Sequence, residues 1–134
     1  MRDLTDLMAG SELFVRPEGK DLKAEEAEKM LSPLGFFTAR LDGAVIKNKQ
    51  DLLAALAAGF RFPSYFGYNW DALLDCLRSL PDNLRARGYA VVIDGSALFL
   101  KDSPADLADF REISAAAAEF ILDKYKLPFK VIML

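Results

Sequence analysis

The feature that most constrains the fold is the alternation of short β-rich segments with helical ones. Segments at residues 36–41, 89–93 and 129–133 have the length and composition of strands, and helical patterns separate each from the next. Two strands that are joined through a helix run parallel in one sheet, because the chain must return to the same end of the sheet. The sequence therefore predicts an α/β protein with a parallel sheet, in which residues 36–41 form a central strand.

The first 35 residues precede this pattern as an extension. Its predicted segments are a helical turn within residues 1–10, a short strand at 12–16, a polar turn at 20–21 and a helix at 23–31. The apolar residues of that helix have helical spacing and are predicted to face inward: Ala24, Ala27, Met30 and Leu31. No strong boundary follows, so we predict one domain over 1–134, with a 36–134 core and an extension whose strand adds to a sheet edge.

Asparagine residues mark the starts of two core helices. An asparagine side chain can accept a hydrogen bond from the first turn, which places helix starts after Asn48 and Asn69. The first of these helices spans residues 49–58, and Gly59 suits the left-handed position that ends a helix. The second helix ends where Pro81 stops it.

The composition excludes several classes of function. The 134 residues contain no histidine, which removes His-based triads, His general bases and the commonest metal ligand. The net charge of −3 argues against a nucleic-acid binder, and no apolar run approaches the roughly 20 residues that span a bilayer. The single cysteine, Cys76, permits no internal disulfide, and residues 1–13 lack the apolar stretch of a secretory signal. We predict a cytoplasmic protein without a cofactor.

Two carboxylates stand one turn apart at the start of the helix that follows Asn69. Asp71, Asp75 and Arg78 lie at i, i+4 and i+7, where the arginine can partly neutralise the second aspartate. A different set forms the predicted core face: Trp70, Leu73, Leu74, Leu77 and Leu80. From the charges alone, a solvated face is the favoured interpretation. An acid/base pair or a metal site is less favoured, because no nearby histidine or lysine completes the first and two ligands make a poor metal site.

An aromatic loop leads directly into this acidic turn. The loop places Gly67, which can take backbone angles closed to other residues, among three aromatic residues: Tyr65, Phe66 and Tyr68. Aromatic anchors beside charged groups are typical of protein interfaces. We expect Phe66 and Trp70 to be mainly structural and Tyr65 to be an exposed contact.

A second acidic segment lies near the C-terminus. Six acidic residues and one arginine occur between Asp102 and Asp123. Some of these acids start a helix, which is an ordinary structural role. Together with Asp71 and Asp75 they predict an acidic surface that would speed encounter with a basic partner.

The pattern Pro63-x-Tyr65-Phe66-Gly67-x-Asn69-x-Asp71-Ala72-Leu73-x-Asp75-Cys76-Leu77 resembles the loop and second helix of the barstar family of intracellular ribonuclease inhibitors. The likeness covers roughly residues 36–134 and is most specific in 62–77. It implies a three-stranded parallel sheet packed with helices. It also implies a protein that is not an enzyme and that plugs the active site of a basic ribonuclease or toxin nuclease.

The resemblance further implies residue roles. The family's loop tyrosine, glycine, capping asparagine and two helix aspartates contact the enzyme, and they match Tyr65, Gly67, Asn69, Asp71 and Asp75. By analogy, Asp75 enters the pocket that normally holds a substrate phosphate, where a carboxylate can pair with arginines. A family glutamate on the last helix corresponds to Asp123 or Glu119.

Two positions on the helix depart from the family pattern and are kept among the expected contacts. Leu74 replaces a tryptophan between the two aspartates, and Trp70 stands where the family has an aliphatic residue. The 35-residue extension has no counterpart in the pattern. These departures leave open an alternative, a barstar-like interaction module that binds a partner other than a ribonuclease. An enzyme is the third and weakest hypothesis.

Overall fold

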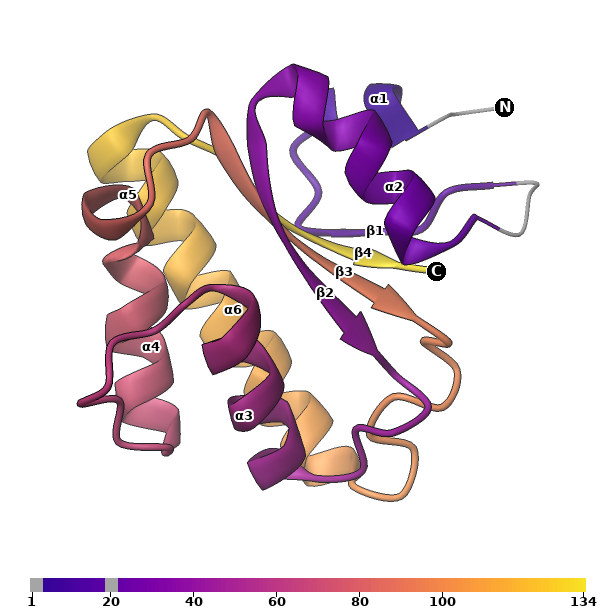
Figure 1. Ribbon diagram of the computed structural model, residues 1–134, viewed down its shortest axis with the longest axis vertical. Coiled ribbons are helices and arrows are strands. Elements are labelled where there is room, and N and C mark those ends of the chain that lie inside the picture. The colour runs from indigo at the N-terminus through magenta and orange to yellow at the C-terminus, as the bar shows by residue number, and fades with distance from the viewer. Residues whose placement is uncertain (1–3, 19–21) are drawn as a thin grey trace.

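The sheet has four parallel strands, one more than the three that the sequence implies. The computed structural model describes residues 4–18 and 22–134 (Figure 1). The strands, in the spatial order β1-β4-β3-β2, are β1 (Phe14–Val15), β4 (Phe129–Met133), β3 (Gly88–Asp94) and β2 (Phe36–Asp42). The extra strand is β1, which pairs with Val131 and Ile132 of β4 at the sheet edge. The parallel α/β architecture is confirmed.

β2 was predicted to be central and is instead an edge strand. It pairs with β3 along its whole length, from Phe36 beside Gly88 to Asp42 beside Asp94, and ends the strand order. The two central strands are β3 and β4, whose residues are buried almost throughout. Phe37, Ala39 and Leu41 on one face of β2 pack on helices, and Phe36 packs on the opposite face of the sheet.

Helices cover both faces of the sheet (Figure 1). One face carries α3 (Lys49–Gly59), α4 (Trp70–Arg78), α5 (Leu80–Asn83) and α6 (Pro104–Tyr125). The other face carries α1 (Leu4–Ala9) and α2 (Ala24–Leu31), which is followed by the short 3₁₀ helix η1 (Ser32–Leu34). The sheet therefore separates a main core from a second core that the extension makes, with Ala90, Val92 and Ile132 on the sheet side of it.

The described part of the extension forms the predicted helices and a strand that is shorter than predicted, Phe14–Val15. The apolar residues of the predicted helical turn, Leu4, Leu7 and Met8, are buried in α1. Met30 is 40% exposed although it was predicted to face inward. The buried stripe of α2 runs along Ala24, Ala27 and Leu31, and Met30 falls at its margin. The predicted turn at residues 20–21 lies outside the described residues.

Two helix ends differ from the prediction. Gly59 is the last residue of α3, and the left-handed residue is Arg61, with φ of 55°. Glycine is needed at 59 for close packing, because a Cβ there would lie 2.8 Å from the Cβ of Ala39 on β2. Pro81 does not stop α4, which ends at Arg78. Pro81 lies in the first turn of α5, where the backbone N–H groups have no partner within the helix, so the missing N–H of proline costs no hydrogen bond.

Candidate partner-binding surface

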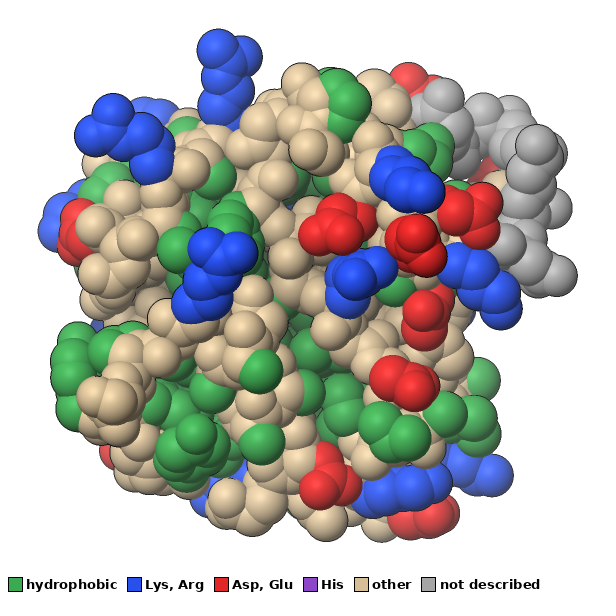
Figure 2. All heavy atoms as spheres, in the orientation of Figure 1, with side chains coloured by type: hydrophobic (Ala, Val, Ile, Leu, Met, Phe, Trp, Pro, Cys, Tyr) green, Lys and Arg blue, Asp and Glu red, His purple; other side chains and the backbone are tan. Residues whose placement is uncertain are grey.

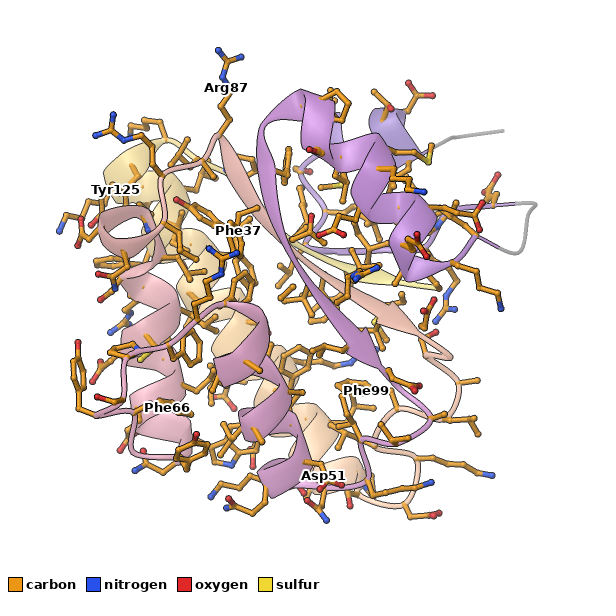
Figure 3. The ribbon with its side chains drawn as sticks, viewed as in Figure 1. Phe37, Asp51, Phe66, Arg87, Phe99 and Tyr125 are labelled. Atoms are coloured by element: carbon orange, nitrogen blue, oxygen red, sulfur yellow. The ribbon has the colours of Figure 1, made fainter. Side chains whose placement is uncertain are left out.

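A chain of aromatic contacts holds the loop between α3 and α4. Phe66 is 6% exposed, and its ring centroid lies 5.0 Å from that of Phe62 and 4.7 Å from that of Tyr68. Phe62 in turn stacks 6.2 Å from Phe60 in the main core. Phe66 is thus structural, as predicted, and Figure 3 shows it beside α4. These contacts leave Tyr65 on the outside of the loop with 82% of its surface exposed, as expected of a contact residue.

Next to Gly67, the residue with a left-handed backbone angle is Tyr68. Its φ is 51°, whereas Gly67 does not have a positive φ, so the predicted role of the glycine is wrong. Gly67 instead leaves room for the side chain that caps α4. A Cβ on Gly67 would lie 3.3 Å from Nδ2 of Asn69, which donates a hydrogen bond to the Gly67 carbonyl. Tyr68 is 48% exposed and is a second accessible ring that the sequence interpretation missed.

Asn69 begins α4 as the sequence predicts. Its Oδ1 accepts a hydrogen bond from the Ala72 N–H at 2.8 Å, and its backbone carbonyl accepts one from the Leu73 N–H at 3.0 Å. The same side chain therefore joins the loop, through Gly67, to the first turn of the helix. This link sets where Asp71 stands relative to the aromatic loop.

Asp71 and Asp75 are exposed charges one turn apart on α4. Neither carboxylate forms a salt bridge with any residue in 4–18 or 22–134. Arg78, predicted to neutralise Asp75 in part, packs instead with its guanidinium Cζ 5.2 Å from the ring centroid of Phe120 on α6. Asp71, in the first turn, is favoured by the helix dipole. Both charges are therefore available to an outside partner.

Trp70 and Leu74 lie at the rim of the predicted core face. The centre of that face, Leu73, Leu77 and Leu80, is buried as expected. Trp70 and Leu74 are half-buried and pack against the main core, and Lys49 Nζ lies 5.5 Å from the Trp70 ring centroid. Hydrophobic side chains gather at the lower left of Figure 2, over the loop before α4. The helix thus offers an apolar margin beside its carboxylates.

Cys76 is packed in the helix rather than presented as a nucleophile. Burial raises the pKa of its thiol, and the neighbouring Asp75 carboxylate raises it further. A raised pKa keeps the sulfur protonated and unreactive at neutral pH. Burial is the larger of the two causes.

Asp123 and Glu119 are exposed near the end of α6, away from the aromatic loop. The Tyr125 hydroxyl donates a hydrogen bond to Asp82 at 3.0 Å, which places the end of α6 beside α5. Asp123 therefore lies near the C-terminal end of α4, whereas Asn69 lies at its N-terminal end. The two ends of a nine-residue helix are roughly 13 Å apart. Which of the two acids contacts a partner stays a prediction.

The comparison with family models explains this arrangement. The model described as Barstar (barnase inhibitor) matches residues 36–133. The chain belongs to the barstar family. The resemblance that we drew from the loop and α4 is thus confirmed, and the match begins at β2, so the extension lies outside it. A comparison with curated proteins found no match.

The described helices and carboxylates fit neither a membrane span nor a metal site. Within 4–18 and 22–134, every helix is too short or too polar to cross a bilayer. The same ranges contain no group of three histidine, cysteine or carboxylate side chains placed to hold a metal ion. Asp71 and Asp75 accordingly have no third such ligand beside them.

Proposed function

We propose that this barstar-family protein blocks the active site of a basic ribonuclease or toxin nuclease by inserting Asp75 where a substrate phosphate binds. The supporting observation is the pair of exposed carboxylates on α4, unpaired within the described chain, next to the exposed ring of Tyr65. Carboxylates without an internal partner keep their charge for the arginines of a phosphate site. The protein would act in the cytoplasm as an inhibitor and not as an enzyme.

The proposed contact surface runs from the loop along α4 to the end of α6. Exposed Tyr65 and half-buried Trp70 and Leu74 supply apolar contact area beside the two aspartates. The other residues of the proposed surface are Gly67, Asn69, Asp71, Asp75 and Asp123. Gly67 contributes its backbone, Asn69 caps the helix, and the three aspartates carry charge. The acidic character of this surface would speed encounter with a basic enzyme.

Titration against a panel of purified basic ribonucleases tests the proposal. The protein should block cleavage by its target at a near-equimolar ratio. Asp75→Asn keeps the shape of the side chain and removes its charge, which would leave the enzyme's arginines unpaired. Loss of one partner of a buried charge pair costs about 3 kcal/mol or more, so inhibition should weaken at least roughly 100-fold.

A matched control removes the same charge elsewhere. Glu25 lies on α2, on the opposite face of the sheet, and its side chain is 67% exposed. Glu25→Gln should inhibit as the unmodified protein does. If Asp75→Asn also inhibits unchanged, Asp75 is not the phosphate mimic.

A partner other than a ribonuclease remains the second candidate. Half-buried Leu74 stands where the family pattern has a tryptophan, so the residue before Asp75 offers no aromatic ring to a ribonuclease. The extension no longer supports this candidate, because it packs on the sheet face opposite to α4. A pull-down from the native host decides between the two. Recovery of a partner without nuclease activity, lost with Asp75→Asn, would favour the second candidate.

A further inference from the structure

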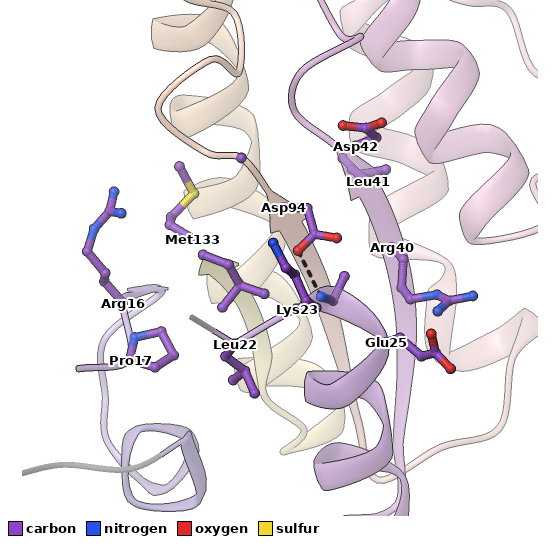
Figure 4. Close-up of a pocket in the computed structure, with 13 residues that line it drawn as sticks. Arg16, Pro17, Leu22, Lys23, Glu25, Arg40, Leu41, Asp42, Asp94 and Met133 are labelled. Carbon is purple, nitrogen blue, oxygen red and sulfur yellow. Dashed lines mark hydrogen bonds between the residues drawn. The ribbon is translucent and has the colours of Figure 1, made fainter. Parts of the chain in front are cut away.

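A crevice of about 860 Å³ opens at the carboxyl end of the sheet (Figure 4). Each strand contributes to its lining near its last residues: Arg16 after β1, Asp42 on β2, Asp94 on β3 and Met133 on β4. The start of α2 completes it. Its volume falls in the range of small-molecule sites, roughly 300–1,000 Å³.

The chain topology places this crevice where open α/β sheets bind ligands. After β1 the chain passes to α2 on one face of the sheet, and after β3 it passes to α6 on the other face. β4 lies between these two strands. Diverging connections leave a gap at the carboxyl ends of the strands, which is the usual ligand position in such sheets. Because β1 and α2 precede the family match, the extension creates this gap.

Two cations that line the crevice have no carboxylate partner in the described chain. Arg16 and Lys23 are exposed, and neither forms a salt bridge with a residue in 4–18 or 22–134. Arg16 donates a hydrogen bond from Nη1 to the Ser96 hydroxyl at 3.2 Å, and within residues 4–18 and 22–134 its other N–H groups have no acceptor. Unpaired cations in a concave site are unexpected in a protein with a net charge of −3.

Three carboxylates line the crevice, and each has a partner in the described chain: Glu25 forms a salt bridge with Lys29 at 3.5 Å, and Asp94 and Asp42 accept backbone hydrogen bonds. Asp94 Oδ1 accepts a hydrogen bond from the Ala24 N–H at 2.8 Å, drawn as the dashed line in Figure 4. Asp42 Oδ1 accepts one from the Ala44 N–H at 3.0 Å. The first N–H of α2 is therefore already satisfied, and the attraction for an anion comes from Arg16 and Lys23 rather than from the helix end.

We propose that the crevice binds a phosphorylated small molecule of mononucleotide size. Arg16 and Lys23 attract the phosphate, for which a guanidinium offers paired donors and an ammonium a compact charge. The body of the ligand lies against the half-buried uncharged residues of the lining: Pro17, Leu22 and Leu134. This site lies at the carboxyl end of the sheet and uses no residue of the α4 surface.

Titration of the ¹⁵N-labelled protein with adenosine monophosphate tests the proposal by NMR. Saturable shifts should appear at the amides of the lining residues. Inorganic phosphate should shift the amides near Arg16 and Lys23 more weakly, and adenosine, which lacks the charge, should not shift them. These arms separate a site for an organic phosphate from a site for the free ion.

Lys23→Ala is the deciding variant, because Arg16→Ala also removes the bond to Ser96. Loss of one charge-assisted contact should weaken binding roughly 10-fold or more. Arg85→Ala removes the same charge before β3, at the opposite end of the sheet, and should bind as the unmodified protein does. Equal binding by Lys23→Ala, or no saturable shift with either phosphate compound, would overturn the proposal. The test requires no nuclease, so its outcome is independent of the inhibitor proposal.

Discussion

Lys130 ties the extension to the sheet, and its replacement tests how firmly the two parts are joined. It lies on the central strand β4 and is 5% exposed, on the same side of the strand as Ile132 of the second core. Its Nζ donates hydrogen bonds to the carbonyl oxygens of Gly10 at 2.6 Å and Glu12 at 2.5 Å. The ammonium therefore satisfies two carbonyls in the segment that joins α1 to β1.

Lys130→Met keeps the length of the side chain and removes both hydrogen bonds. Each bond from a charged donor contributes about 1.5–3 kcal/mol, or roughly 3–6 kcal/mol together. Part of this is offset, because burial lowers the pKa of Lys130 and the buried ammonium thus carries a desolvation cost that methionine avoids. We expect the free energy of unfolding to fall by about 2–4 kcal/mol, which is about 6–15 °C in Tm for a chain of this size.

Urea and thermal unfolding followed by circular dichroism measure this loss. Lys101→Met, which changes an exposed lysine in the same way, should leave the midpoint within about 0.5 kcal/mol. Equal midpoints for Lys130→Met and the unmodified protein would refute the anchoring role.

The pH dependence gives a second measure of the same lysine. Because the folded pKa lies below the ordinary value of 10.5, the unfolded chain holds more protons between the folded pKa and that value. Stability should therefore rise with pH through this window, and Lys130→Met should lack that rise.

Three further experiments test local features of α3 and α4. Asn69→Ala removes the cap on the Ala72 N–H and should lower the free energy of unfolding by about 1 kcal/mol in urea, whereas an unchanged midpoint would show that the cap contributes nothing. Gly59→Ala places a Cβ 2.8 Å from that of Ala39. The free energy of unfolding should fall by about 1–2 kcal/mol, which already includes the gain in helix propensity. Adding Ala39→Gly should restore part of this free energy, and no recovery in the double variant would contradict the clash. The rate of alkylation of Cys76 by iodoacetamide should rise with pH around a midpoint that is higher than that of a free cysteine. Asp75→Asn should lower this midpoint, because the aspartate is the second cause of the raised pKa. An unchanged midpoint would exclude an effect of Asp75 on the thiol.

Features that depend on neighbours within one helical turn were predictable from the sequence. Asn48 and Asn69 cap their helices as expected, because each side chain bonds an N–H only three residues away. The exposure of Tyr65 and the burial of Phe66 also followed from the spacing of the loop. The expected contact roles of these residues stay predictions until a partner is tested.

Features that depend on distant neighbours were not predictable in the same way. Residues 36–41 have the composition of a central strand, yet the order of strands in the sheet puts them at an edge. Gly59 was predicted to take a left-handed backbone angle at the end of a helix. Glycine is required there instead because the backbone packs closely on Ala39, twenty residues earlier in the chain. In each case a local pattern admits several tertiary neighbours, and the pattern alone does not choose among them.

The sequence by itself determined the parallel α/β class, the capped acidic helix and the family, because these rest on spacings within short segments. Tertiary structure alone decided that the extension builds a second core, that Lys130 is buried, and that Arg78 packs on Phe120 instead of pairing with Asp75. The physical reason is that a side chain's charge is encoded locally, whereas its partner is chosen by packing between segments far apart in the chain.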